Sequence, residues 1–395
     1  MRRRLLELLC CPHCRGPLGL RAVRVAVPDP AGPAGSAALE EVIEGVLSCA
    51  GCGRAYPVLD AIPRLCPEPT PSESAALERL ATAAGPVVER LPAPPADPYA
   101  KIEELVRAKS ALSREAGAYA RQRTENDVRF RVRECEKQDK YANTLRRHFD
   151  RRPGTLLDVG GGQGGLIKCL TERFQPALAI LVDYDLEWAE VARLRCPDVE
   201  VVKADATCLP LRSDAMDLVV SQAVLEHVEA CDAALDELAR VTRGTLLLSW
   251  GPTRFSAYDL AHLDAPITLL PKAVGRQVAF LWHRLRRTGI TMRAIDDGLR
   301  TTFYISTPHV RRRLARHGRV RNVFAEFMAF SLQSDYAFNL QGTREFLRRH
   351  PAFALLLLRA IAALHVEPNG YLLMEKRPTS TNMSFAASPG SSAAQ

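Results

Sequence analysis

The chain has 395 residues, of which 47% are hydrophobic and 25% are charged. These are ordinary values for a globular protein, and they exclude a wholly disordered or fibrous chain. At roughly 150 residues per domain, this length predicts two or three domains. Lys and Arg exceed Asp and Glu by 53 − 45 = 8 charges. This mild excess allows contact with nucleic acid, an anionic membrane surface or a phosphorylated substrate, and it selects none of them.

The N-terminal sequence MRRRLLELLCCPHC resembles a signal peptide only in its basic start. Glu7 interrupts the apolar stretch, and cysteines stand where a small-residue cleavage site would be expected. The longest apolar run, residues 353–364, contains Arg359 and is too short to cross a bilayer. The eleven cysteines are clustered and too sparse for a secreted disulfide scaffold. We therefore expect a cytoplasmic protein, with peripheral membrane contact as an open alternative.

Composition divides the chain into segments. Between Thr155 and Trp250, short apolar runs alternate with helical patterns, which is typical of βαβ units around a parallel sheet. The predicted segments are a cysteine-rich domain at 1–66, a Pro- and Ala-rich linker at 67–100, a larger domain at 101–377 and a disordered tail at 378–395. Within the larger domain we expect a core at 150–252 and a helical, basic region at 253–370.

The first motif consists of two C-x2-C pairs, each followed by a glycine. Two such turns supply four thiolates, which form a closed tetrahedral set suited to structural Zn²⁺. Redox chemistry would need a single pair, so the repetition favours a metal. Cys10 could replace its neighbour but does not give the matching spacing, and Cys66 is expected to pack in a core. The predicted metal ligands are Cys11, Cys14, Cys49 and Cys52.

The runs LLELLCCPHCRGPL and LSCAGCGRAYPVLDAIPRL resemble a family of small zinc-ribbon proteins. That family comprises the activator subunit of several eukaryotic and archaeal methyltransferases and its stand-alone bacterial relatives. The resemblance implies that residues 1–66 form a zinc ribbon without an active site, with a packing or docking role. It is carried by Cys11, Cys14, Cys49, Cys52, Tyr56, Pro57, Asp60, Ile62 and Pro63.

The second motif is TLLDVGGGQG, which begins at Thr155. An apolar strand ends in glycines that let the backbone turn sharply and approach a ligand closely. The next strand, LAILVD, ends at Asp183, where a carboxylate can accept hydrogen bonds from ribose hydroxyls. Gly165 also completes a G-x-G-x-x-G pattern, so these residues alone leave NAD binding as an alternative.

The run VEVVKADATCLPLRSDAMDLVVSQAVLEHV and the later LDELARVTRGTLLLSW resemble class I S-adenosylmethionine-dependent methyltransferases. The resemblance implies an α/β fold: a Rossmann-like seven-stranded sheet with helical lid insertions, beside the ribbon. It also implies a cofactor site for S-adenosylmethionine, formed by Asp158, Gly160, Gly162, Gly164, Asp183, Tyr184, Asp205, Ala206 and Gln222.

Roles follow from the same resemblance. Asp158 and the glycines would shape the methionine end of the pocket, Asp183 would bind the ribose, and Tyr184 would pack on the adenine. Asp205 would accept from the adenine amino group, with the Ala206 backbone beside it. Gln222 would stand where the fourth strand opens towards the methyl group.

The catalytic base is less constrained. A hydroxyl or carbon nucleophile needs one, and His227 in VLEHV lies in the region that faces the substrate. A histidine is frequent there in the family whatever the reaction, so a structural role stands beside the catalytic one. Tyr258 and His262, after the fifth strand, are the rival candidates.

The substrate class follows from what the fourth strand lacks. It is followed by Ser221-Gln-Ala-Val, where enzymes that methylate adenine or glutamine nitrogens usually carry Asn/Asp-Pro-Pro-Tyr/Phe. The basic, apolar run Phe280–Arg287 and the arginines between residues 311 and 321 suit a lipid-linked or amphiphilic acceptor at a membrane surface. A helical lid with a solvated charged face and an RNA contact fit the same residues, and the sequence does not choose among the three. We predict O-methylation of a small-molecule or lipid-linked substrate. An RNA base methyltransferase and a non-catalytic cofactor-binding scaffold are the alternatives.

Overall fold

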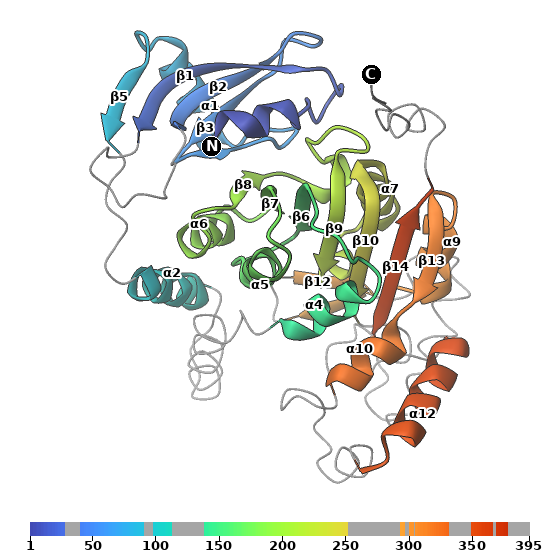
Figure 1. Ribbon diagram of the computed structural model, residues 1–395. Helices are drawn as coiled ribbons and strands as arrows, with labels where there is room; N and C mark the ends of the chain where they lie inside the picture. The colour runs from blue at the N-terminus through green and yellow to red at the C-terminus, as the bar shows by residue number, and fades with distance from the viewer. Residues whose placement is uncertain are drawn as a thin grey trace, which may run out of the picture.

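The computed structural model describes residues 1–27, 40–90, 98–112, 138–251, 293–296, 300–303, 305–331, 349–365 and 369–377. Two sheets organise these residues (Figure 1). The N-terminal sheet has five strands and the main sheet seven, and β11 (Arg293–Asp296) pairs with β12 (Arg300–Phe303) as a separate hairpin. No helix in the described part of the chain combines the length and the apolarity that a bilayer span requires.

The N-terminal sheet is the predicted ribbon. A 3-10 helix, η1 (Arg3–Glu7), leads into the first cysteine turn, and the second cysteine turn joins two antiparallel strands. The sheet has the order β4-β3-β2-β1-β5. Its strands are β1 (Leu18–Val27), β2 (Glu41–Cys49), β3 (Ala55–Leu59), β4 (Ile62–Pro63) and β5 (Val87–Arg90).

The segment predicted as a linker contributes to this sheet. Helix α1 (Pro71–Ala81) begins with a capping box, in which Thr70 and Glu73 satisfy each other's backbone N–H groups. Leu80 of α1 is fully buried against the ribbon, and β5 pairs in parallel with β1. Residues 71–81 and 87–90 therefore form a regular helix and strand beside the ribbon. In addition, Glu73 forms an ion pair with a residue far along the chain. That partner is Lys203, whose Nζ lies 2.7 Å from the Glu73 Oε1.

The main sheet confirms the predicted α/β class. Its order is β13-β14-β10-β9-β6-β7-β8, and β14 is antiparallel to both of its neighbours. The central strands are almost wholly apolar and buried because helices and the ribbon cover both faces. The strands are β6 (Thr155–Val159), β7 (Leu178–Asp183), β8 (Glu200–Lys203), β9 (Met216–Gln222), β10 (Thr242–Trp250), β13 (Gly318–Asn322) and β14 (Gly370–Lys376).

Each face of the main sheet has its own hydrophobic core. One core joins the sheet to α7 (Cys231–Val241), α9 (Thr307–Leu314) and the ribbon. The other joins it to α4 (Asp139–Arg146), α5 (Gly165–Phe174), α10 (Phe324–Ser331) and α12 (Pro351–Ala363). Helix α2 (Pro98–Leu112) packs instead on α6 (Leu186–Arg195) in a small cluster of its own.

The region predicted as a helical lid is partly core. Its described residues 305–331 supply α9, the sheet strand β13 and α10. Among the arginines that suggested a basic surface, Arg313 bonds to Asp232 and Asp236 of α7, and Arg321 pairs with Glu375 at 3.4 Å. Tyr258, His262 and the run 280–287 lie outside the described residues.

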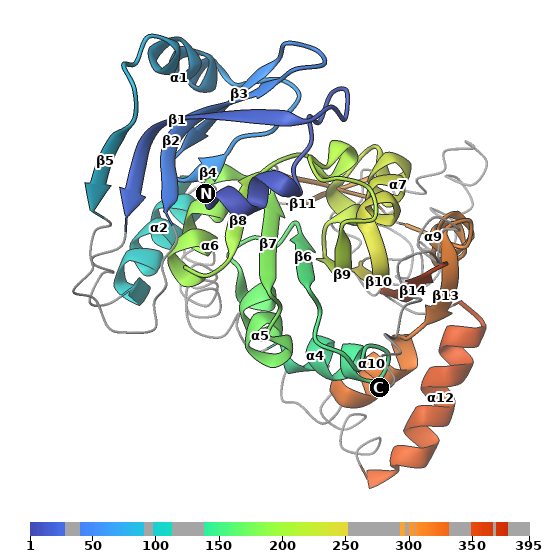
Figure 2. The same ribbon diagram turned by 45° about the horizontal axis from the view of Figure 1, so that its top comes forward.

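The ribbon covers a face of the main sheet beside β8 (Figure 2). The connection from β8 to β9 contains only the short 3-10 helix η3 (Ala206–Cys208), whereas β6, β7 and β9 are each followed by a full α-helix. Leu5 and Leu9 of the ribbon share one core with Leu209 and Leu211, and all four are fully buried. The N-terminal domain thus fills the place of a crossover helix.

Candidate metal centre and cofactor pocket

The four predicted metal ligands come together between the two cysteine turns. Their sulfur atoms all lie within 4.8 Å of one another. Cys11 Sγ is 3.7 Å from Cys52 Sγ, and Cys14 Sγ is 3.4 Å from Cys49 Sγ. Among the described residues, these four cysteines form the cluster of side chains that could hold a metal ion.

The surroundings of these sulfurs fit Zn²⁺. A Cβ atom on Gly16 would lie 3.2 Å from Cys49 Sγ and 3.3 Å from Cys14 Sγ, so the backbone approaches the sulfurs closely. The Tyr56 hydroxyl lies 3.3 Å from Cys11 Sγ and can donate a hydrogen bond to its thiolate. Four thiolates with no open position suit a structural zinc ion. Cys10 and Cys66 are buried and lie outside the group.

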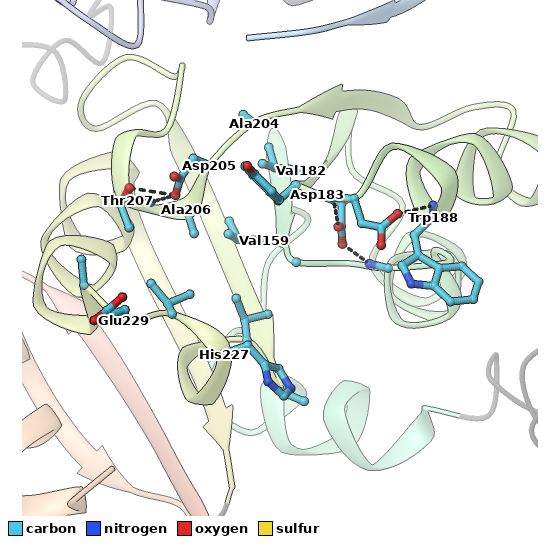
Figure 3. A pocket seen from close by; sticks show the side chains of 18 of the residues that line it. Val159, Val182, Asp183, Trp188, Ala204, Asp205, Ala206, Thr207, His227 and Glu229 are labelled. Carbon is cyan, nitrogen blue, oxygen red and sulfur yellow. Dashed lines mark hydrogen bonds between the residues drawn. The ribbon is translucent and has the colours of Figure 1, made fainter. Parts of the chain in front are cut away.

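A cavity of about 880 Å³ lies where four parallel strands end (Figure 3). It is lined by residues that directly follow β6, β7, β8 and β9. Ligands of doubly wound sheets bind outside the carboxyl ends of the strands, which is the location of this cavity. Its size is within the range of sites that hold a drug-sized ligand or a cofactor.

The glycine loop after β6 brings backbone to the cavity. Gly160 has a φ of +71°, and a Cβ there would collide with the Val224 side chain. Gly162 has a φ of +53° and donates its N–H to Asp183 Oδ2 at 2.7 Å. At Gly161, a Cβ would lie 2.6 Å from Leu181 and 2.9 Å from Asp158 Oδ2. A side chain at position 161 would therefore have to displace the Leu181 side chain or the Asp158 carboxyl group.

Two carboxylates at the ends of neighbouring strands line the cavity. Asp183 Oδ1 accepts from the Asp185 N–H at 2.8 Å, while its Oδ2 accepts from Gly162. Asp205 Oδ1 accepts from the Thr207 N–H at 2.7 Å and from its hydroxyl at 2.8 Å. These bonds fix both side chains, and a carboxylate retains further lone pairs for ligand hydroxyl or amino groups.

Asp158 lies beneath the cavity and does not line it. Its side chain is 1% exposed, and among the described residues only the Ile167 N–H acts to favour its charged form. Burial, together with the nearby Asp183 charge, raises the pKa of Asp158 to about 8. The carboxyl group is therefore largely protonated at neutral pH, and the glycine loop packs directly over it.

We expect Asp158→Asn to stabilise the ligand-free protein, by an amount that grows between pH 5 and pH 8. A raised pKa means that the folded state holds a proton which the unfolded chain has already released. The wild type therefore loses stability as the pH rises from the ordinary carboxyl range towards 8, by up to about 1.4 kcal/mol per pH unit. Asn is neutral throughout, so urea unfolding of both proteins across this range measures the difference.

Asp217→Asn is the matched control. Burial alone would raise the pKa of Asp217, but bonds from Arg243, Thr155 and Gly154 lower it overall. Its stabilising effect is therefore already complete above the ordinary carboxyl range, and the variant should be less stable by a constant amount from pH 5 to pH 8. A constant difference for Asp158→Asn as well would contradict the raised pKa.

The other predicted cofactor residues fall into two groups. Tyr184 and Ala206 line the cavity, with the Tyr184 side chain 67% exposed. Gly164 instead precedes α5 as its N-cap with a φ of +81°, and Gln222 ends β9 outside the lining. Further lining residues belong to no motif in the sequence, although most of them lie within a few residues of a strand end: Gln163, Asp185, Trp188, Thr207, Val224 and Glu229.

His227 lies in the 3-10 helix η4 (Leu225–His227) and lines the same cavity. Its side chain is exposed, so it can meet a bound ligand. The preceding Glu226 is 4% exposed and was not foreseen. Burial raises the pKa of Glu226 to about 7, and its Oε1 accepts from the Gly251 N–H at 3.3 Å.

Comparisons with known proteins match both domains. Residues 2–60 match the family model described as Trm112p-like protein, and residues 157–247 match the model described as methyltransferase domain. The first match contains the four-cysteine group. The second contains the glycine loop, both cavity-lining carboxylates and His227.

Similar sequences cover parts of the chain. An uncharacterised 37.1 kDa protein of a Streptomyces fradiae transposon is 31% identical over 40% of this chain and 47% of its own length. A probable S-adenosylmethionine-dependent methyltransferase of Mycobacterium tuberculosis is 38% identical over 24% of this chain and 33% of its own length. A malonyl-[acyl-carrier protein] O-methyltransferase of Geobacter sulfurreducens is 38% identical over 22% of this chain and 34% of its own length. The chain thus spans a third to a half of the length of these relatives. The chain joins a domain that matches the Trm112p-like family to a domain that matches the methyltransferase family.

Proposed function

We propose that this chain transfers the methyl group of S-adenosylmethionine to an oxygen of a small-molecule or lipid-linked acceptor. The observation that carries the proposal is the shared cavity: the glycine loop, Asp183 and Asp205 surround one space at the carboxyl edge of the sheet. A nucleoside linked to an amino acid needs such a set of groups, because its ribose and adenine offer donors and its methionine part needs close backbone contact.

Each group has a binding role in this proposal. Asp183 accepts from the ribose hydroxyls, and Asp205 accepts from the adenine amino group. Tyr184 and Trp188 offer aromatic surface to the base from the end of β7 and from α6. Gly160 and Gly162 leave room for the methionine part, because no side chain projects from the loop there.

The main contribution of the protein to methyl transfer is to orient the acceptor relative to the methyl group. When bound, S-adenosylmethionine supplies a methyl group already activated by its sulfonium charge. The chain must hold the acceptor oxygen in line behind that carbon, which is an entropic contribution. His227 is our candidate for accepting the hydroxyl proton at an imidazole nitrogen, because it lines the cavity after β9.

The choice of oxygen and of the acceptor class rests on two supports. The relative from Geobacter sulfurreducens is named for O-methylation of a group attached to a carrier. The arginines at α9 and β13 that could have favoured RNA are in part neutralised by Asp232, Asp236 and Glu375. Nucleic acid remains the alternative acceptor, and peripheral membrane contact is part of the lipid-linked proposal.

Methyl-labelled S-adenosylmethionine tests the proposal directly. The purified protein is incubated with a cell extract of its source organism, which is then separated into lipid, small-molecule, RNA and protein fractions. We expect label in the lipid or small-molecule fraction, and His227→Asn should reduce it by about 10²-fold or more. Label in RNA would establish the alternative acceptor. Cofactor binding without any transfer would identify a non-catalytic scaffold.

A further inference from the structure

The segment between β8 and β9 forms one wall of the cofactor cavity and is anchored on the ribbon. Asp205, Ala206 and Thr207 line the cavity within it. On either side of these three residues, backbone hydrogen bonds join the segment to the N-terminal domain. They run from Leu65 N to Lys203 O at 2.8 Å, from Cys10 N to Pro210 O at 3.0 Å and from Arg212 N to Leu8 O at 2.9 Å.

Arg15 of the ribbon adds a side-chain contact close to the lining residues. Its guanidinium donates to the Leu209 carbonyl at 2.7 Å and pairs with Glu237 Oε2 at 2.8 Å. Arg240 donates to the same carbonyl at 2.9 Å and pairs with Glu237 Oε1 at 2.8 Å. One carbonyl, two residues past Thr207, is thus held by two cations, and the carboxylate between them offsets their repulsion.

The first cysteine turn sets the position of Arg15. The Arg15 N–H donates to the Cys11 carbonyl at 2.9 Å, and the Cys11 N–H donates to the Gly16 carbonyl at 2.9 Å. Arg15 has a φ of +65°, an uncommon conformation for a residue with a side chain. Cys11 and Cys14 are metal ligands in this turn, so a bound zinc ion and the Arg15 contacts depend on one backbone conformation.

We propose that Arg15 is a positioning residue for the cofactor, through which the zinc turn and the cofactor cavity stabilise each other. The turn places Arg15, Arg15 fixes the Leu209 carbonyl, and this carbonyl fixes the wall that presents Asp205. The inference rests on the proposed binding of S-adenosylmethionine. Coupling between two sites is reciprocal, so a bound cofactor must increase the affinity for zinc by the same factor by which bound zinc increases the affinity for the cofactor.

Binding of S-adenosylhomocysteine to the full zinc-loaded chain, measured by calorimetry, tests the first half. Glycine adopts a positive φ without strain, so Arg15→Gly should fold and keep its metal while losing the contact. We expect its Kd to rise about tenfold, within the 5- to 150-fold range of ordinary coupling. Arg15→Lys retains one cation and should recover part of the loss. Arg54→Ala is the control, because Arg54 lies in the other cysteine turn and bonds to Pro67 O at 2.8 Å.

Zinc release to a colorimetric chelator tests the second half without any methyl acceptor. Saturating S-adenosylhomocysteine should slow release from the wild type several-fold and leave release from Arg15→Gly nearly unchanged. Wild-type affinity in zinc-loaded Arg15→Gly, or equal effects of the nucleoside on both proteins, would overturn the role of Arg15. Failure of the wild type itself to bind would instead contradict the proposed function, and with it this inference.

Discussion

Cys11→Ser should remove the metal and unfold the ribbon. Three thiolates and a hydroxyl bind Zn²⁺ far more weakly than four thiolates, and structural zinc contributes roughly 10–16 kcal/mol in small zinc domains. That is comparable to the whole stability of a domain, about 5–15 kcal/mol. Because the ribbon covers Leu209 and Leu211 in the connection from β8 to β9, its loss should also expose apolar surface and cause aggregation. Metal analysis and thermal unfolding measure the two effects.

Cys10→Ser is the matched control for this experiment. Cys10 is the adjacent residue and is also buried, but its sulfur is outside the group of four. This variant should retain about one zinc per chain and unfold at a temperature close to that of the wild type. If Cys10→Ser lost the metal and Cys11→Ser kept it, the ligand assignment would be wrong.

Asp183→Ala should weaken binding of S-adenosylmethionine by about one to two orders of magnitude. A hydrogen bond to a charged group contributes roughly 1.5–3 kcal/mol, and the ribose would lose its acceptor. The Gly162 N–H would lose its partner as well, so the glycine loop should also loosen. Calorimetry on folded protein measures the change, and NAD should not bind the wild type.

The control carboxylate is Asp198, whose side chain is 94% exposed and pairs only loosely with Arg2, at 3.9 Å. Asp198→Ala should bind the cofactor with wild-type affinity, since this residue lies outside the cavity lining. Equal affinity in Asp183→Ala would show that Asp183 is not the ribose ligand. A comparable loss in both variants would point to a general effect of charge instead.

Local sequence was sufficient for the parts of each site that follow from spacing. The two C-x2-C pairs each form a tight turn, and the pairing of β1 with β2, which sets Leu18 opposite Cys49, brings the turns together. Parallel strands place the residues that follow them at one edge, so Asp183 and Asp205 could be predicted to meet. Two further lining residues lie close to the predicted ones in the sequence: Thr207 is one residue after Ala206, and Glu229 is two residues after His227.

Other features of the fold depend on contacts between residues far apart in the sequence. Residues 67–100 are predicted as a linker because they are rich in Pro and Ala, yet Glu73 is 2% exposed beside Lys203. The strand β13, GRVRN, is polar because it lies at the edge of the sheet, so it carried no strand signal. A side chain at position 161 would likewise meet Leu181, on the neighbouring strand.

By itself, the sequence indicated the α/β class, the group of four cysteines and the carboxylate at the end of β7, because those depend on residue type and spacing within short segments. The ribbon, the seven-stranded sheet and the other cofactor residues were implied by resemblance to known families. Only the tertiary structure placed the ribbon over the connection from β8 to β9. That arrangement depends on burial of Leu5 and Leu9 against Leu209 and Leu211, about 200 residues away. No local pattern encodes such a contact, because each partner alone reads as an ordinary apolar residue.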